Sequence, residues 1–118
     1  MPIFNTKNRN IMDLGHAGEH GNIAEIKRLI EVEKVPVDAR LPNDPFHTHS
    51  SSQMAAARHQ PETLELLLRT YHGDPFIKSR SKMSLDAIAW KHEDYKSAFV
   101  AWRAQAEMVY GHLRQKLL

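Results

Sequence analysis

The chain contains no cysteine among its 118 residues. Without thiols it has neither disulfide bonds nor thiolate ligands for zinc, which excludes a disulfide-stabilised scaffold and a cysteine-based zinc fold. We therefore expect the protein to fold in a cytoplasmic compartment, with delivery into a host cell as an effector kept as an alternative.

Long apolar runs are also missing, and none approaches the ~20 residues that a membrane-spanning helix requires. The first ten residues, MPIFNTKNRN, lack the apolar core of a secretion signal. The 16 basic residues nearly balance the 14 acidic ones, so the formal net charge is only +2. We expect a single domain with no membrane partner, and the small charge disfavours nucleic acid as a partner.

Glycine is scarce, and its five residues are scattered. None of them forms the glycine-rich loop that cradles a phosphate group. Serines lie beside histidines in HSSSQ (residues 49–53), but no acidic residue is placed to orient a histidine as a base. We therefore predict no cofactor and no catalytic residue, which means that the protein is not an enzyme.

One motif nevertheless carries possible chemistry, because HAGEH (residues 16–20) matches the His-x-x-Glu-His pattern of one class of zinc peptidase. His16 and His20 are one helical turn apart and could reach the same ion, while Glu19 would polarise the bound water. Further ligands are offered only by glutamates on a second short helix, and Gly18 weakens the helix that would carry the pair. A metal-dependent hydrolase is therefore an alternative and not the main interpretation.

A second group of histidines surrounds the following loop and consists of His47, His49 and His59. A His-x-His pair with a third histidine could form a metal site. However, eight histidines in a chain of this length will cluster by chance, and a pH-dependent contact explains the group equally well. We predict no metal site, with five histidines as minor candidates: His16, His20, His47, His49 and His59.

Apolar residues recur at helical spacing in several segments that are separated by turn-forming residues. Pro61 suits the first turn of one of these helices, and Ser84 is expected to be the N-cap of another. We predict an all-α fold with helices over residues 11–20, 23–34, 52–59, 60–75, 84–92 and 94–118.

The order of short helix, longer helix and extended loop occurs twice, and the sequence repeats with it. AGEHGNIAEIKRLIE (residues 17–31) aligns without a gap with AAARHQPETLELLLR (residues 55–69), and a weaker copy begins at residue 84. Ala17, Ala55 and Ala89 take the same position, at steps of 38 and 34 residues. We expect these small side chains to let neighbouring helices pack closely.

This pattern resembles the ankyrin repeat, whose unit of about 33 residues contains a hairpin-like loop and two antiparallel helices. The Thr-Pro-Leu-His opening of that family is missing, and its turn glycine is kept only at Gly21. The resemblance covers roughly residues 8–100 and implies an α-solenoid that forms one domain over residues 1–118. Its parts would be two clear repeats (8–40 and 43–78), a degenerate third (81–100) and a C-terminal capping helix (94–118).

The C-terminal helix is longer than one repeat needs, at about 24 residues or roughly 36 Å. We expect its aromatic residues to cover the open end of the stack and Trp90 to fill the core of the third repeat, with an exposed contact on the inner face as the alternative for Trp90. The helix either projects from the stack or folds back over it, and a homodimer through it is an open alternative. Its apolar stripe comprises Tyr95, Phe99, Trp102, Ala106, Val109, Leu113 and Leu117.

The resemblance implies a non-catalytic module that binds another protein through loop fingers and a concave face. The first finger, LPNDPFHTHSS (residues 41–51), is longer than the repeat requires, and long ordered loops often carry binding residues. The second finger, FIKSRSK (residues 76–82), has three basic residues that we expect to point the same way along an extended segment and to suit an acidic surface. Its segment 78–82 also makes a weak nucleic-acid binder an alternative. The predicted partner-binding residues are Phe46, His47, His49, Arg58, Lys78, Arg80, Lys82 and Lys91.

Overall fold

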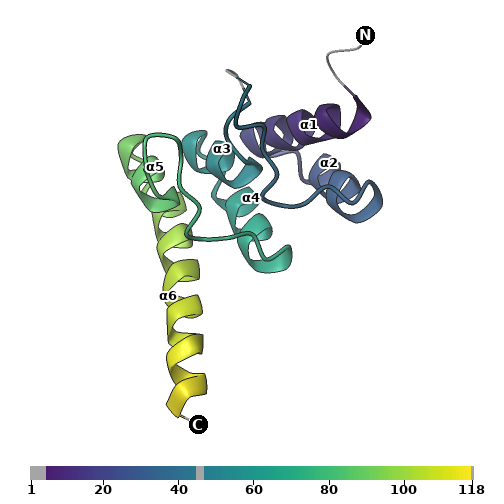
Figure 1. The fold of residues 1–118 in the computed structure, drawn as a ribbon. Coiled ribbons are helices and arrows are strands. Elements are labelled where there is room, and N and C mark those ends of the chain that lie inside the picture. The colour runs from purple at the N-terminus through teal and green to yellow at the C-terminus, as the bar shows by residue number, and fades with distance from the viewer. Residues whose placement is uncertain (1–4, 45–46, 118) are drawn as a thin grey trace.

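The structure is a computed structural model that describes residues 5–44 and 47–117 (Figure 1). Over these two ranges the chain is helical and contains no strand, which confirms the predicted all-α class. No helix within them is both long and apolar enough to cross a membrane. The α-helices are α1 (Thr6–His20), α2 (Ile23–Lys27), α3 (Ser51–Ala57), α4 (Pro61–Glu65), α5 (Leu85–Lys91) and α6 (Tyr95–Leu117).

Two of these helices continue directly into a short π-helical turn at the same point of the repeat. Helix α2 passes into η1 (Arg28–Val32), and α4 passes into η2 (Leu66–Thr70). The two turns start 38 residues apart, which is the step from Ala17 to Ala55. The repeat that we predicted from side chains therefore also shapes the backbone.

Capping residues set the starts of the helices. Ser84 is the N-cap of α5, as predicted, and its side chain accepts a hydrogen bond from the Ala87 N–H at 3.4 Å. Ser50 caps α3 in the same way. Helix α1 begins five residues before the predicted start because Asn5 caps it and accepts from the Asn8 N–H at 2.8 Å.

The turn between the two helices of each unit is made identically three times. The N–H of the fifth residue after each recurring alanine donates to the carbonyl of that alanine: Asn22 to Ala17 at 2.9 Å, Gln60 to Ala55 at 3.1 Å, and Asp94 to Ala89 at 2.9 Å. The turn also takes a left-handed residue each time, at Gly21 (φ 67°), His59 (φ 59°) and Glu93 (φ 56°). We therefore refer to three units: unit 1 (α1, α2 and η1), unit 2 (α3, α4 and η2) and unit 3 (α5 and α6).

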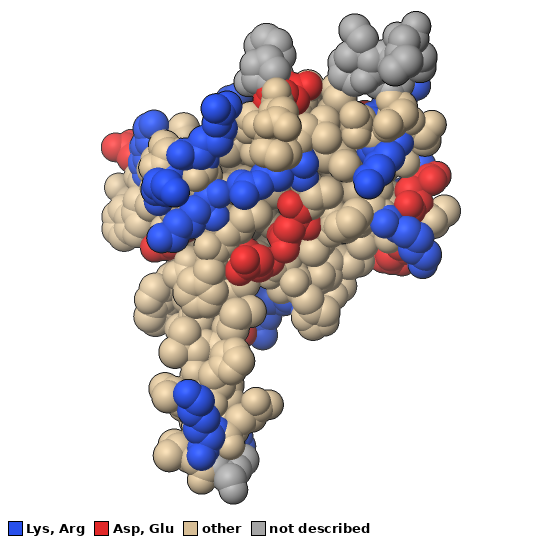
Figure 2. Space-filling view, viewed as in Figure 1, with Lys and Arg blue, Asp and Glu red and all other residues tan. Residues whose placement is uncertain are grey.

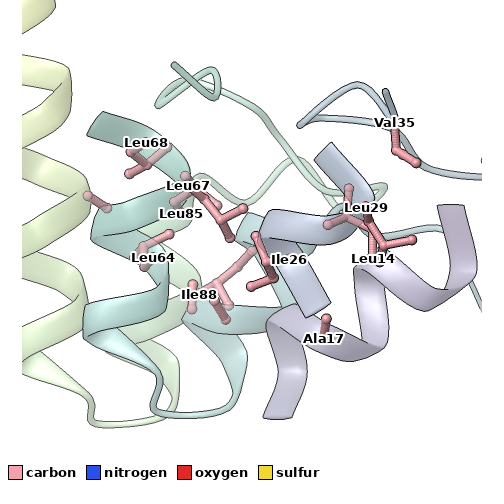
Figure 3. Close-up of a cluster of buried hydrophobic side chains, with 13 residues drawn as sticks. Leu14, Ala17, Ile26, Leu29, Val35, Leu64, Leu67, Leu68, Leu85 and Ile88 are labelled. Atoms are coloured by element: carbon pink, nitrogen blue, oxygen red, sulfur yellow. The ribbon is translucent and has the colours of Figure 1, made fainter. Parts of the chain in front are cut away.

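The recurring alanines lie where neighbouring units meet. Ala17 is 5% exposed, Ala55 and Ala89 are fully buried, and α3 packs against α1 on one side and α5 on the other. Around them the aliphatic side chains form one continuous core, which Figure 3 shows as a row from Leu14 and Leu29 in unit 1 to Leu64 and Leu68 in unit 2. Burial of such side chains is the main force that holds the stack together.

Helix α6 packs on α4 and α5, but the prediction for its aromatic residues was wrong. Tyr95, Phe99 and Trp102 are each more than half exposed, whereas Ser97, Ala98 and Ala101 form the packed face. Small side chains occupy this face because they let the helix axes approach closely, as the recurring alanines do elsewhere. The C-terminal half of α6 projects away from the other helices (Figure 1).

Trp90 is not the core filler that we predicted for unit 3. Its side chain is 60% exposed, and its ring lies against the ring of Tyr95 at a centroid distance of 4.8 Å. The core position beside it is already filled by Ala89 and Ile88, which are buried. Trp90 therefore belongs to the same exposed surface as the aromatic residues of α6.

The two fingers begin alike and differ in length at their tips. The Leu41 N–H donates to His47 O, and the Ser79 N–H donates to Met83 O, both at 3.0 Å. The first hairpin thus contains two more residues than the second, and two further residues separate it from its helix cap at Ser50. These four residues account for the difference between the steps of 38 and 34.

The tip of the second finger is a tight turn and not the extended segment that we predicted. The Lys82 N–H donates to Ser79 O at 2.9 Å, and Lys82 itself adopts a left-handed conformation with φ 68°. Successive side chains of a turn point in different directions. Lys78, Arg80 and Lys82 are exposed on this turn.

Candidate functional site

A groove lies between α3, α5 and the two fingers. Its volume is about 480 Å³, which is within the range of a small ligand site or a pocket for a peptide side chain. The first helices of units 2 and 3, which are α3 and α5, and both fingers contribute to its lining. The lining residues are His49, Gln53, Met54, Ala57, Arg58, Ser79, Ser81, Met83, Ile88, Lys91 and His92.

The repeat explains why these side chains converge. Met54 and Ile88, Ala57 and Lys91, and Arg58 and His92 are three pairs of lining residues that are each separated by 34 residues. Each pair takes equivalent positions on α3 and α5. The groove therefore follows from stacking two copies of the same unit side by side.

The lining of the groove is apolar at its helical positions and basic at its edge. Met54, Ala57, Met83 and Ile88 supply the apolar part, and Met83 and Ile88 are largely buried. Methionine side chains are flexible and adapt to a partner of irregular shape. Such a surface can receive an apolar side chain of a bound segment.

The charge of the groove is positive. Its lining contains Arg58 and Lys91 but no aspartate or glutamate. Figure 2 shows Lys and Arg side chains gathered over α5 and the loop that leads into it. Within the described ranges, no carboxylate lies within ion-pair distance of Lys91 or of the three basic residues on the second finger: Lys78, Arg80 and Lys82. Their charges are therefore available to an acidic partner.

Arg58 is held in place by the glutamate of the HAGEH motif. Arg58 Nε lies 3.1 Å from Glu19 Oε2, which joins unit 2 to unit 1. His16 Nδ1 and His20 Nε2 each lie 3.6 Å from the other oxygen of the same carboxylate. Glu19 therefore orients a basic side chain at the edge of the groove.

The structure does not complete a metal site around this motif. In the described part of the chain, no group of three or more histidine, aspartate or glutamate side chains is arranged to hold a metal ion. The hydrolase alternative requires a third protein ligand beside His16 and His20. None of the glutamates of α2 and η1 supplies it.

The other three candidate histidines lie in separate places. His47 Nδ1 is 3.0 Å from Asp44 Oδ1, and its ring meets the ring of His16 edge-on at 5.3 Å. His49 lines the groove. His59 Nδ1 is 3.8 Å from Asp94 Oδ2, at the turn between α3 and α4. The contact of His47 with His16 attaches the first finger to α1, and the three histidines do not assemble a ligand set.

His49 is electrostatically coupled to the base of the first finger. Burial lowers the pKa of His49, and the nearby Arg40 guanidinium lowers it further. Arg40 Nη1 also donates to the carbonyl of Lys78 at 2.9 Å, which ties the first finger to the second. Arg40 therefore positions both fingers at the groove.

Of the predicted binding residues, the structure brings three together in the groove: His49, Arg58 and Lys91. Lys78, Arg80 and Lys82 lie on the neighbouring second finger, whose Ser79 and Ser81 are the lining residues. His47 faces α1 instead, and Phe46 lies outside the described residues.

Sequence analysis missed the apolar lining and His92. Alignment of the repeats could have identified these residues. His92 occupies the position of Arg58 in the next unit, and Ile88 occupies the position of Met54. Arg40 gave no such signal, since the sequence does not show which carbonyl its side chain reaches.

No protein-family model matches the chain. No curated protein sequence matches it either. The function of the groove must therefore be inferred from its own geometry and charge.

Proposed function

We propose that the protein is a non-catalytic interaction module of the ankyrin type. It binds a short acidic segment of another protein in the groove between α3, α5 and the two fingers. The repeated units support the first part of this proposal, since each contains two helices joined by the same turn and the first two units are each followed by a hairpin. This organisation is typical of ankyrin repeats.

The observation that carries the proposal is the basic, acid-free lining of the groove. Arg58 is oriented by Glu19, and Lys91 lies on the next unit without an acidic partner in the described ranges. An acidic segment that spans the two units would meet the unpaired Lys91 and would share Arg58 with Glu19. Charge complementarity of this kind raises the rate and the specificity of association.

The apolar lining adds a second requirement for the ligand. A segment with one apolar side chain between acidic residues would place that side chain against Met54, Met83 and Ile88. The surface of the groove is smaller than that of a standard protein interface, to which each partner contributes about 800 Å². We therefore expect a short peptide to bind with modest affinity and with a strong dependence on salt.

The proposal is tested with labelled ten-residue peptides by fluorescence anisotropy at low salt. The first peptide carries glutamates around a central leucine, the second replaces the glutamates with lysines, and the third replaces the leucine with serine. We expect the first peptide to bind at least about tenfold more tightly than either of the others. The second peptide lacks the acidic side chains, and the third lacks the apolar side chain. Equal binding of all three would contradict the proposal.

Charge reversal at the groove gives the matched test. Lys91→Glu should weaken binding of the acidic peptide at least about tenfold, because it adds repulsion where attraction existed. Lys27→Glu is the control, since Lys27 is also exposed but lies on α2, outside the groove. A labelled single-stranded DNA forms a further arm. The proposal fails if the DNA binds more tightly than the peptide and the DNA binding is lost in Lys91→Glu.

A further inference from the structure

The exposed face of α6 is an apolar surface that the groove does not use. Eight large apolar side chains line it, and each is between 49% and 87% exposed. We call this surface the aromatic seam. Its members are Trp90, Tyr95, Phe99, Trp102, Val109, Tyr110, Leu113 and Leu117.

The spacing of the seam is that of a coiled coil. From Tyr95 to Leu113 its central positions follow steps of four and three residues in strict alternation: Tyr95, Phe99, Trp102, Ala106, Val109 and Leu113. This spacing keeps the apolar residues on one line along a helix, which suits pairing with a second helix. The line runs beside the packed face of Ser97, Ala98 and Ala101, and its residues are exposed except for the half-buried Ala106.

The seam is larger than a monomer normally leaves exposed. An aromatic side chain presents ~150–250 Å², so the exposed fractions of the eight residues amount to on the order of 1,000 Å². The largest apolar patch on a typical monomer is about 300–600 Å². The seam also reaches the roughly 800 Å² that each partner contributes to a standard interface.

We propose that the seam is the interface of an antiparallel homodimer, in which α6 of one copy pairs with α6 of a second copy. In the register that opposes Ala106 and Trp102, a small residue faces the largest one in both halves of the interface. The same register opposes Phe99 and Val109, and Tyr95 and Leu113. A two-fold axis makes every such pair occur twice, which is how one surface becomes complementary to itself.

The charges at the two ends of α6 select the antiparallel orientation. The tip carries Arg114 and Lys116, and the exposed Glu93 lies just before the base, where Glu62 is already paired with Lys96 at 3.0 Å. Antiparallel pairing places the basic tip of one copy beside Glu93 of the other. A parallel pair would instead bring four positive charges together at the tips.

The proposed register also accounts for Trp90. Leu113 of one copy lies opposite Tyr95 of the other, so the last turn of the helix continues past Tyr95 toward α5. That turn carries Leu117, which is 87% exposed in the single chain. Leu117 thereby covers Trp90, which no element of its own chain buries.

The test is the molar mass of the full chain by light scattering at about 10–100 µM. We expect twice the chain mass of 13.6 kDa, and a monomer at these concentrations would overturn the proposal. Trp102→Lys should weaken the dimer at least ~30-fold, as expected for a central tryptophan of an interface. Gln115→Lys adds the same charge to the same helix outside the seam and should leave the dimer intact.

Trp102 is more than half exposed in the single chain, so its substitution should not unfold the protein. The helical circular dichroism and the acidic-peptide affinity of Trp102→Lys should match those of the unmodified chain. Since the seam and the groove are separate surfaces, a failed dimer leaves the groove proposal unaffected. A dimer that persists in Trp102→Lys would contradict the seam as its interface.

Cross-linking of introduced cysteines determines the orientation of the two helices. The chain has no cysteine of its own, so each variant carries a single thiol. Arg103→Cys lies near the expected two-fold axis, so a short bismaleimide should join the two copies. Leu117→Cys should not react between copies, since the two tips would be ~40 Å apart along an antiparallel pair. Cross-linking at Leu117→Cys without reaction at Arg103→Cys would show a parallel dimer and overturn the proposed orientation.

Discussion

The contact between α1 and α3 depends on the missing side chain of Gly18. A Cβ atom at this position would overlap Ser51 Oγ and would lie only 2.5 Å from the Ser51 carbonyl oxygen. The Ser51 hydroxyl cannot turn away without loss, because it donates to the Leu14 carbonyl at 2.9 Å. Gly18 weakens the helix by itself, but it lets units 1 and 2 pack.

Gly18→Ala should therefore lower the free energy of unfolding by about 2 kcal/mol, because overpacking at the contact outweighs the better helix propensity of alanine. Urea denaturation followed by circular dichroism measures the change. Gly111→Ala is the matched control, since no atom lies within 4 Å of a Cβ at that helical position. It should change the free energy of unfolding by less than ~0.5 kcal/mol, and equal effects of the two variants would contradict the close contact.

The turn residues show what a single sequence does not reveal. Gly21 was predicted to lie in the turn of unit 1, and the structure shows it there in the left-handed conformation with φ 67°. His59 and Glu93 take the same conformation without being glycine. Their side chains carry no signal of it, so only the register of the repeat could have predicted these turns.

The fingers are joined at their base by Asp38. Its Oδ2 accepts a hydrogen bond from the Asp74 N–H at 2.9 Å, so one loop supports the other. Oδ1 is buried and has no hydrogen-bond partner among the described residues. Burial raises the pKa of Asp38, and the nearby Asp74 carboxylate raises it further.

A raised pKa means that the folded protein favours the neutral form of this side chain. The corresponding stability is present below the unfolded pKa of about 3.9 and is lost as the pH rises through the folded value. Asp38→Asn cannot ionise and keeps an acceptor for the Asp74 N–H. We expect this variant to be more stable than the unmodified chain at pH 7.

The measurement compares thermal unfolding of the two proteins between pH 4 and pH 7. The difference in stability should shrink toward pH 4, because Asp38 is increasingly protonated there. A difference for Asp38→Asn that stays constant with pH would show that its charge is not the cause.

The helices were predictable where aliphatic periodicity marks a buried face. Ile26 and Leu29 in α2 and η1, and Leu64 and Leu67 in α4 and η2, are buried as their spacing indicates. The same reasoning failed for α6, because periodicity identifies an apolar face without saying whether the chain itself covers it. The packed face of α6 consists of serine and alanine, which give only a weak signal.

The groove was predictable in part. Arg58 and Lys91 were chosen because they lie on the first helices of their units, and both line the groove. The orientation of Lys78, Arg80 and Lys82 was not predictable, because it depends on the backbone of a tight turn. The link between Arg58 and Glu19 also depends on how α1 packs beside α3.

The molecule as a whole is a short stack with one projecting helix, and it measures 54 × 32 × 26 Å. Its closest packing joins neighbours along the chain: α1 with α3, α3 with α5, and α5 with α6. The end of α6 contributes no buried residue, since residues 107–117 are all exposed. We therefore expect the stack to determine the free energy of unfolding and the projecting end to contribute little to it.

Ending the chain after Tyr110 should change the free energy of unfolding by less than ~0.5 kcal/mol when measured at concentrations that keep the protein monomeric. The removed segment makes no core contact. Ending the chain after Phe99 is the contrasting case, because it also removes the fully buried Ala101 and the rest of the α6 packing surface. That shorter chain should lose its cooperative transition in urea, and similar losses in both truncations would contradict this division.

The packing of consecutive units against one another also affects how the chain folds and where it is degraded. A stack of this kind has few distant contacts to close, so its folding should be fast and should be able to start in more than one unit. The outermost helices open most easily, and proteolysis acts first on such locally opened segments. Loss of α1 and α2 by fraying would leave α3 and α5 in contact, so the apolar part of the groove would outlast unit 1 while Arg58 would lose its Glu19 partner.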